Sequence, residues 1–256
     1  MQVHFHKYQG TGNDFVMIDN RDSHFEHHIP TIVQLCDRKF GIGADGLILI
    51  ENHPTLDFEM VYFNADGSKS LCGNGSRCAV NFACALDIFE GSTKFLTIDG
   101  EYHATIKEEI VHLNMRNQLA PEKFDSHYFL NNGSPHHIEF VANADSTNVY
   151  SEGKNRRYLD TYKPEGTNVN FVEIIDHHKI YVRTYERGVE DETLSCGTGI
   201  TASALAAADK GLKSPITIKA KGGELEVKFD KAADGSFKQI QLIGPAKKVF
   251  EGTIEI

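Results

Sequence analysis

A four-residue segment, Cys-Gly-x-Gly, occurs once in each half of the chain. It stands at Cys72–Gly75 and again at Cys196–Gly199, 124 positions further on (196 − 72) in a chain of 256 residues. Each copy opens a run of small and apolar residues at helical spacing, so both are expected to lead into a buried helix. The repeat distance is far longer than that of a solenoid, and it therefore predicts a duplicated chain with two similar lobes.

Short strands account for most of the remaining pattern. They are expected at residues 2–8, 15–19, 47–51, 58–63, 93–98 and 102–115 in the first half, and at 128–130, 138–142, 168–175, 179–185 and 248–256 in the second. One further helix is expected from Pro30 to about Lys39, with Gly41 as its stop. Each half therefore contains several strands around one apolar helix.

The composition limits the classes of protein to which the chain can belong. Apolar residues make up 40% and charged residues 24%, which is typical of a globular protein. The net charge of −10, without a basic cluster, argues against a nucleic-acid or anionic-membrane surface, and no apolar run is long enough to span a membrane. The N-terminal residues lack the apolar core of a signal peptide, so a cytoplasmic protein is expected.

The cysteines and histidines do not form a recognisable metal or disulfide pattern. The five cysteines are Cys36, Cys72, Cys78, Cys84 and Cys196, and no Cys-x-x-Cys pair occurs among them. The histidine pairs at 27–28, 136–137 and 177–178 are adjacent in sequence and would point to opposite faces of a strand. We therefore expect neither structural disulfides nor a metal ion.

Each Cys-Gly-x-Gly segment places a thiol beside a site that suits an anion. Glycines let the backbone approach a ligand closely, and the first helical N–H groups have no partner within the helix. With the helix dipole, these groups favour a carboxylate, and a thiol at the same place is expected to have a lowered pKa. Two such segments could hold one carboxylate and place a thiol on each face of its α-carbon, as an enzyme that inverts this carbon requires.

Polar residues end a strand shortly before each cysteine. Asn64 follows the aromatic Phe63 and precedes Cys72, and Glu186 with Arg187 follows Tyr185 before the second cysteine. Ligands commonly bind at the ends of strands. Glu186 and Arg187 form either an ordinary solvated ion pair or a pair that holds the ammonium and carboxylate groups of an amino acid.

These segments closely resemble the diaminopimelate epimerase family, whose members interconvert LL- and meso-diaminopimelate without a cofactor. The resemblance spans essentially the whole chain, in this order: Gly10–Phe15, Phe40–Asp45, Phe63–Ser68, Cys72–Cys78, Gly133–His136, Thr167–Val169, Glu186–Gly188 and Cys196–Gly199. It implies an α+β fold of two pseudo-symmetric lobes, each with mostly antiparallel strands wrapped around a central helix. The lobes are expected at residues 1–116 and 117–246, with the active site in the cleft between them and a closing strand, 247–256, that returns to the first lobe.

The resemblance also implies a role for each site residue. Cys72 and Cys196 are the two acid/base groups, and His136 and Glu186 tune them. Substrate contacts are implied for Gly73, Asn74, Gly197 and Thr198 at the reacting carboxylate, and for Asn13, Asn64, Asn168, Glu186 and Arg187 at the distal stereocentre. Taken without the family, His136 is equally well an ordinary loop histidine after Pro135. The family further implies a role in lysine and peptidoglycan precursor synthesis, no cofactor, and a homodimer that buries the segment around Phe250.

Two positions depart from the family pattern. Gly46 stands where some members carry a glutamine that contacts the substrate, and Ser134 stands where many carry asparagine. Related racemases that act on proline or hydroxyproline typically have histidine where this chain has Asn74, and isomerases resembling the phenazine-pathway enzyme lack the paired cysteines. The residues therefore favour diaminopimelate as the substrate.

Two other classes of function remain open on the sequence. The two cysteines could form a reversible disulfide in a redox-sensing or thiol-exchange protein, although the polar residues around them suit an amino acid better. A pure binding module would give no reason for two activated thiols.

Overall fold

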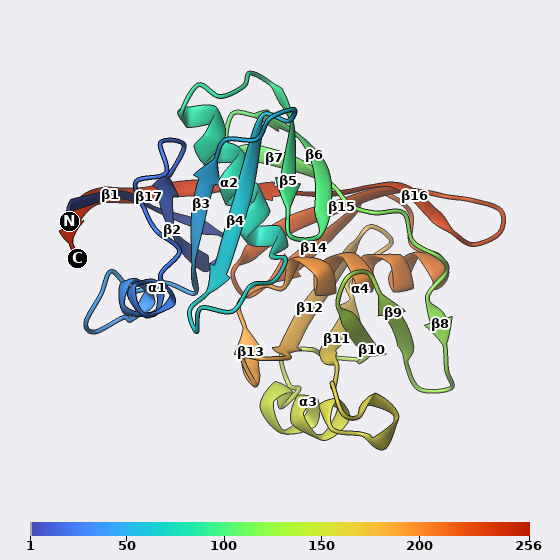
Figure 1. The fold of residues 1–256 in the computed structure, drawn as a ribbon. Helices are drawn as coiled ribbons and strands as arrows, with labels where there is room; N and C mark the ends of the chain where they lie inside the picture. Colours follow the sequence, from blue (N-terminus) through green and yellow to red (C-terminus); the bar gives the residue numbers. More distant parts are fainter. Residues whose placement is uncertain (1) are drawn as a thin grey trace. The chain divides into compact units, whose positions relative to one another are not determined.

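The chain forms two compact units in a computed structural model that describes residues 2–256 (Figure 1). The first unit comprises the chain up to Leu113 together with Gly244–Ile256, and the second comprises Asn114–Ile243. The boundaries predicted from the sequence are 116/117 and 246/247, and those of the structure are 113/114 and 243/244. Within residues 2–256, no helix is both long and apolar enough to cross a membrane.

The first unit is built from strands β1 to β7, the closing strand β17 and helices α1 and α2. Their bounds are β1 (Gln2–Gly10), β2 (Asn13–Asp19), α1 (Ile29–Cys36), β3 (Gly46–Glu51), β4 (Phe58–Asn64), α2 (Gly73–Ala85), β5 (Ser92–Thr97), β6 (Gly100–Lys107), β7 (Ile110–Asn114) and β17 (Lys247–Glu255). Neighbouring strands follow the order β17, β1, β2, β3, β4, β5, β6, β7. The pairs β2–β3 and β4–β5 are parallel, and the others are antiparallel.

The second unit is built from strands β8 to β16, two helices and a 3₁₀ turn. Their bounds are β8 (Glu122–Lys123), β9 (Tyr128–Asn131), β10 (Pro135–Phe140), α3 (Val149–Arg157), η1 (Asp160–Tyr162), β11 (Asn168–Ile174), β12 (Lys179–Glu186), β13 (Asp191–Thr193), α4 (Gly197–Asp209), β14 (Ile216–Ala220), β15 (Gly223–Lys231) and β16 (Phe237–Pro245). Here β10–β11 and β12–β14 are the parallel pairs, and the other pairs are antiparallel.

The two units repeat one topology. In the first, α1 joins the parallel strands β2 and β3, and α2 joins β4 and β5. In the second, α3 joins β10 and β11, and α4 joins β12 and β14 after the short strand β13. The antiparallel pairs occur at equivalent places in both units. The predicted α+β fold of two similar lobes is thus confirmed, and the cysteine-led helices α2 and α4 are equivalent elements.

Each cysteine-led helix lies against several strands of its own unit. Helix α2 contacts strands β1 to β4, β6 and β17, and α4 contacts β9 to β12, β14 and β15 (Figure 1). Helix α1 packs on the other face of the first sheet, where Ile32 and Leu35 meet Leu47 and Phe63. Strand β3 is therefore covered on both faces, which accounts for its continuous apolar run, Leu47–Ile50.

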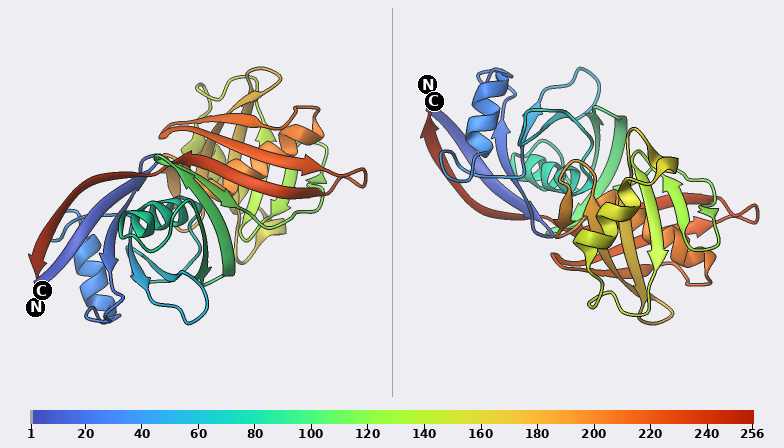
Figure 2. Two further views of the ribbon diagram at one scale, coloured as in Figure 1. Left: turned by 90° about the horizontal axis from the view of Figure 1, so that it is seen from above. Right: turned by 90° about the horizontal axis from the view of Figure 1, so that it is seen from below.

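The first and last strands of the chain form an antiparallel ribbon. Strand β1 pairs with β17 along nearly its full length, so that the two ends of the chain lie side by side (Figure 2). His6 faces Glu251 across this ribbon, and Phe5 faces Gly252.

Two sequence-based predictions need correction, and one helix was not predicted. The first helix ends at Cys36 rather than near Lys39, because the Asp37 carboxylate accepts the N–H groups of Lys39 and Phe40 and turns the chain. The expected strand 102–115 is divided into β6 and β7. Helix α3 was missed because Val149 and Gly153 are its only buried residues, which leaves no apolar stripe to recognise.

The contact between α3 and β12 leads to a stability prediction for Gly153→Ala. A Cβ at Gly153 would lie 2.3 Å from Tyr185 Cβ, so the helix approaches the sheet through this glycine. Alanine in an exposed helix would stabilise the protein by about 1 kcal/mol. Here we expect the opposite sign, a loss of about 1–3 kcal/mol, because the added methyl overpacks the contact. Urea unfolding of the variant measures the change.

The matched control is Ser151→Ala, at an exposed position of the same helix. We expect it to change the free energy of unfolding by less than about 0.5 kcal/mol. A Gly153→Ala protein as stable as the wild type would show that α3 does not pack closely on β12.

Candidate active site

Cys72 caps the N-terminus of α2. Its backbone is extended, with φ −130° and ψ 112°, and its Sγ accepts the N–H of Gly75 at 3.4 Å. The same sulfur lies 3.4 Å from Asn13 Oδ1, to which its S–H donates. A Cβ at Gly75 would approach Ile48 Cδ1 to 3.1 Å, so this glycine also lets the first turn of α2 pack on β3. The thiol is therefore held at the positive end of a helix, with one donor and one acceptor beside it.

A group of charged residues fixes the orientation of Asn13. Its Nδ2 donates to Asp45 Oδ2 at 2.6 Å, which leaves Oδ1 to face Cys72. Arg38 donates to both Asp45 and Asp14, and Lys7 lies 2.7 Å from Asp14. Burial raises the pKa of Asp14, but hydrogen bonds from Arg38 and Lys7 outweigh it and lower the pKa to about 2. The amide of Asn13 is thus oriented by its hydrogen bond to Asp45, which Arg38 in turn holds in place.

Arg77 is a fully buried cation one turn into α2. Its Nη2 donates to Asn74 Oδ1 at 3.0 Å and to Thr11 Oγ1 at 3.2 Å. Its Nε and Nη1 are buried without a hydrogen-bond acceptor. Burial lowers the pKa of Arg77 to about 10, so the guanidinium remains positive at neutral pH. This charge acts on Cys72 from within the helix.

Asn64 lies at the end of β4 and is hydrogen-bonded to Tyr62, whose ring leaves no room for a side chain at position 46. Tyr62 Oη donates to Asn64 Oδ1 at 2.9 Å, and Asn64 Nδ2 donates to Ser68 Oγ at 2.9 Å. A Cβ at Gly46 would lie 2.5 Å from both the Tyr62 ring and the carbonyl oxygen of Phe63. The tyrosine ring therefore occupies the space that a glutamine at position 46 would need.

Cys196 is likewise the N-cap residue of α4, but a different set of residues surrounds its sulfur. Its backbone is extended, with φ −115° and ψ 110°, and its Sγ lies 3.5 Å from Thr198 Oγ1. The Thr198 hydroxyl also lies 3.0 Å from His136 Nε2. Asn132 Nδ2 donates to the backbone oxygen of Thr198 at 2.9 Å, which holds the first turn of α4.

Asn170 determines which nitrogen of His136 carries the proton. Its Oδ1 accepts the Thr184 hydroxyl at 3.0 Å, and its Nδ2 donates to the backbone oxygen of His137 at 3.1 Å. The Nδ2 group therefore donates also to His136 Nδ1, 3.1 Å away. With Nδ1 as an acceptor, a neutral His136 carries its proton on Nε2 and donates it to Thr198. The Thr198 hydrogen is then available to Cys196 Sγ.

His136 is fully buried in strand β10, so the alternative of an ordinary loop histidine is wrong. Burial, together with the charge of Arg187, lowers the pKa of His136 to about 3 and keeps the ring neutral. A Cβ at Gly199 would lie 2.4 Å from Asn170 Oδ1 and 3.3 Å from His136 Cε1. Glycine at this position is therefore required for α4 to approach the histidine.

Three of the five residues predicted for the distal stereocentre lie at the start of β11 and the end of β12. Asn168 Nδ2 donates to Ser134 Oγ at 2.8 Å and to Pro135 O at 2.9 Å, and its Oδ1 accepts the N–H of Arg187 at 2.9 Å. Ser134 thus contacts Asn168 directly. Glu186 Oε2 accepts the Thr193 hydroxyl at 2.8 Å. Asn168 and Glu186 thus lie on the adjacent strands β11 and β12, and Arg187 directly follows β12.

Two of the remaining cysteines are buried thiols, and one group of residues has the spacing of metal ligands. Burial raises the pKa of Cys36 to about 12 and also raises that of the fully buried Cys78, so both remain thiols at neutral pH. Within residues 2–256, the ligand-type side chains that approach one another closely enough to share a metal ion are His4, His6 and Glu251. Neither Cys72 nor Cys196 belongs to this group.

Comparison with known proteins decides the family. The model of the diaminopimelate epimerase family matches residues 5–117 and 128–249. The chain belongs to the diaminopimelate epimerase family. A diaminopimelate epimerase from Flavobacterium psychrophilum is 52% identical over 254 residues, which cover 97% of this chain and 99% of the relative. Another, from Chlorobaculum tepidum, is 44% identical and covers 96% and 99%. The resemblance drawn from the motifs is confirmed.

Solved structures of more distant proteins share the fold. A phenazine biosynthesis protein of the PhzF family from Bacillus anthracis has a TM-score of 0.79 at 15% identity, with both chains fully covered. A probable proline racemase from Agrobacterium radiobacter has a TM-score of 0.69 at 16% identity, covering 99% of this chain and 93% of the racemase. At this level of identity, the similarity concerns the fold alone.

The structure brings some predicted site residues together and adds others. Asn13 and Asn74 meet at Cys72, and Thr198 meets both Cys196 and His136. Gly73 and Gly197 are the first residues of α2 and α4. Arg77 and Asn170 were not predicted. Arg77 could have been noticed as a charge inside an apolar helix, whereas nothing in the sequence distinguishes Asn170.

The surroundings of His136 predict both its charge and its tautomer. We expect its ring nitrogens to show the neutral form protonated at Nε2 from pH 8 down to about pH 5 in ¹⁵N NMR spectra, because burial lowers its pKa to about 3. In the unfolded chain this histidine has the ordinary pKa of 6.5, so below that pH the unfolded chain binds a proton at His136 more readily than the folded protein does. Stability from this group is thus present above about pH 6.5 and is lost as the pH falls toward about 3.

A histidine-containing peptide supplies the reference titration for these spectra. Protonation of His136 near the peptide value, or a proton on Nδ1, would contradict the hydrogen-bond assignment through Asn170.

Proposed function

We propose that this protein interconverts LL-2,6-diaminopimelate and meso-2,6-diaminopimelate, in the synthesis of lysine and peptidoglycan precursors. The observation that carries the proposal is the repeated cysteine at the N-terminus of an equivalent helix, α2 in one unit and α4 in the other. Relatives that carry the name diaminopimelate epimerase cover nearly the whole chain, which supports this substrate. We propose no cofactor, because two thiols suffice for the proton transfers.

The proposed reaction uses Cys72 and Cys196 as a pair of bases. One cysteine, as the thiolate, removes the α-proton from one face of the carbon, and the other, as the thiol, returns a proton to the opposite face. The C–H electron pair is held as a carbanion-like species between these transfers and forms the new C–H bond. Each turnover exchanges the protonation states of the two cysteines, so the roles reverse with the direction of reaction. The proposal requires both units to act on one substrate molecule.

Several contacts support a role for Cys72 as an acid/base group. The Gly75 N–H and the positive end of α2 stabilise a negative charge on its sulfur. The buried charge of Arg77 has the same effect. When the sulfur is protonated, Asn13 Oδ1 accepts the S–H. Both the thiol and the thiolate of Cys72 therefore have a hydrogen-bonding partner.

Thr198 and His136 are proposed to tune Cys196. His136 donates to the Thr198 oxygen, which directs the threonine hydrogen toward the sulfur. A hydrogen bond from a neutral donor stabilises the thiolate without adding a fixed charge beside it. Glu186, the other proposed tuning residue, accepts a hydrogen bond from Thr193.

The substrate contacts follow the chemistry of each end of diaminopimelate. The N–H groups of the first turns, at Gly73, Asn74, Gly197 and Thr198, are proposed to hold the reacting carboxylate and the negative charge that develops beside it. Asn13, Asn64, Asn168, Glu186 and Arg187 are proposed to hold the ammonium and carboxylate of the distal stereocentre. A carboxylate and a guanidinium together match these two charges.

Exchange in deuterated water tests the two-base reaction. We expect that the first product formed carries deuterium at the inverted carbon, whereas unreacted substrate keeps its protium. The reason is that a thiol on the far face, already exchanged with solvent, supplies the new proton. NMR or mass spectrometry of both isomers at low conversion, without added pyridoxal phosphate, gives the measurement. Product that retains the substrate protium would indicate a single base, and no reaction would favour the redox alternative.

Serine substitutions test the two cysteines separately. We expect Cys72→Ser and Cys196→Ser each to lower kcat by about 10²–10⁴-fold, because a serine hydroxyl is a far weaker acid than a thiol. Cys84→Ser, on the same helix as Cys72 but not in the proposed site, is the matched control and should retain activity. Full activity in either cysteine variant would exclude the two-base mechanism.

Arg77 is proposed to act on Cys72 as a positioning residue. We expect Arg77→Met to lower kcat and to move the acidic limb of the pH–rate profile to higher pH, because the thiolate loses a nearby positive charge. Arg77→Lys retains a charge and should restore the position of this limb. Arg21→Met, which removes an ion pair with Asp19, is the control. A folded Arg77→Met protein with an unshifted profile would contradict this role.

A further inference from the structure

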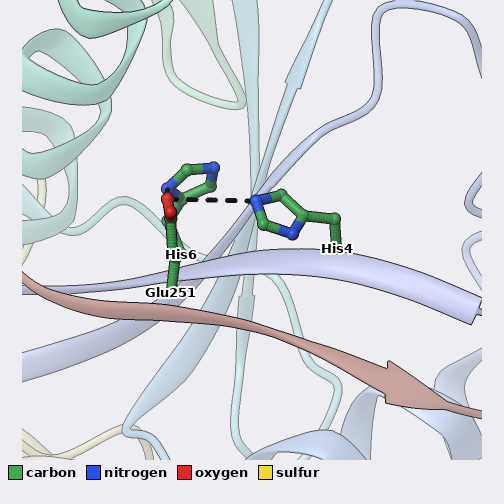
Figure 3. Close-up of side chains that lie close together, drawn as sticks. All are labelled: His4, His6 and Glu251. Atoms are coloured by element: carbon green, nitrogen blue, oxygen red, sulfur yellow. Dashed lines mark ion pairs between the residues drawn. The ribbon is translucent and has the colours of Figure 1, made fainter.

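Three side chains of the terminal ribbon converge on one point (Figure 3). His4 and His6 are two residues apart on β1, so both rings project from the same face of the strand. Glu251 lies on β17, directly opposite His6 in the antiparallel register. The first and last strands of the chain thus contribute to one group of histidine and carboxylate side chains.

The distances in this group approach those of a metal centre. His6 Nδ1 lies 3.1 Å from Glu251 Oε2, and His4 Nε2 lies 3.9 Å from the same oxygen. One ligand atom from each residue lies within 4.8 Å of the others. Ligands about 2.0–2.1 Å from a tetrahedral zinc ion are about 3.3 Å apart. A small rotation of the exposed His4 and Glu251 side chains would therefore complete the geometry.

His6 is already held in place for this role. Its ring packs against Phe82 of α2, with 4.8 Å between the ring centroids, and its side chain is 15% exposed. Its Nδ1 is buried and makes no hydrogen bond of acceptable geometry.

We propose that His4 Nε2, His6 Nδ1 and a Glu251 carboxylate oxygen bind a divalent transition-metal ion of the zinc type. Two imidazoles and one carboxylate are a ligand set that zinc accepts, with water in the fourth position. Mg²⁺ and Ca²⁺ prefer oxygen ligands and are not expected to bind. The three residues include none of those proposed for the epimerase reaction, and neither proposal depends on the other.

Lys248 competes with the ion for Glu251. Its Nζ donates to Glu251 Oε2 at 2.6 Å, so a metal ion must displace this ammonium group from the oxygen. Removing the charge of Lys248 should consequently strengthen metal binding. This effect distinguishes a site at Glu251 from metal bound elsewhere on the protein.

A metal ion here would link the first and last strands of the first unit. An ion that binds the folded chain and not the unfolded one stabilises the fold in proportion to its binding free energy. The melting temperature should therefore rise with zinc concentration.

The test is calorimetric titration of the full chain with ZnCl₂ and, separately, with CoCl₂, whose absorption spectrum reports the ligands. The protein carries no histidine tag and has Cys72→Ser and Cys196→Ser as background, because thiolates also bind zinc. We expect one ion per chain, a higher melting temperature and a cobalt spectrum without thiolate bands. Adding His4→Ala or Glu251→Gln should weaken binding by more than about 10-fold, whereas Lys248→Met should tighten it.

The control for these variants is His24→Ala, which removes an exposed histidine in contact with the Asp22 carboxylate and should bind zinc unchanged. His4 and Glu251 are exposed, so their variants are expected to remain folded, and circular dichroism verifies this. The proposal is overturned if zinc leaves the melting temperature unchanged, if folded His4→Ala and Glu251→Gln proteins bind as tightly as their background, or if Mg²⁺ binds equally well.

Discussion

The structure depends on a cysteine placed immediately before the first turn of a buried helix. The cysteine has an extended backbone, and glycines follow it in the first turn of the helix. Because these glycines have no side chain, the first turn can pack closely on neighbouring residues while it lies beside the sulfur. In α2 this brings Gly75 onto β3, and in α4 it brings Gly199 onto Asn170. The strands of each unit surround the corresponding helix. The same glycine therefore serves both the packing of the unit and the local environment of its thiol.

The duplicated motif made much of the fold predictable, because a repeat in sequence implied a repeat in structure. Both cysteine-led helices and most strands follow from apolar periodicity together with glycine and proline positions, and the α+β class was implied by the family resemblance. Helix α3 could not be found in this way, since its contact with the sheet is made by a valine and a glycine. The helix α1, which connects β2 and β3, gave better evidence for α3. Because the topology is duplicated, an equivalent element must connect β10 and β11.

The environment of each thiol was less predictable than the thiols themselves. Asn170 reaches His136 because β10 and β11 pair in parallel with a defined register, which no local pattern encodes. From the sequence, Arg77 was not distinguished from an exposed arginine, whereas in the structure it is fully buried and is an internal source of positive potential. His4 and His6 meet Glu251 only because the two ends of the chain pair. The homodimer expected around Phe250 remains a prediction.

Because Gly46 and Tyr62 are in close contact, the residue allowed at each position depends on the residue at the other. Because the tyrosine ring fills the volume beside Gly46 and its hydroxyl holds Asn64, neither residue can change freely while the other stays. A glutamine at position 46 requires a smaller residue at position 62 together with a shift of the Phe63 carbonyl, and Asn64 then needs a new donor. The two positions should therefore evolve as an epistatic pair, in which the order of substitutions decides which intermediates retain activity.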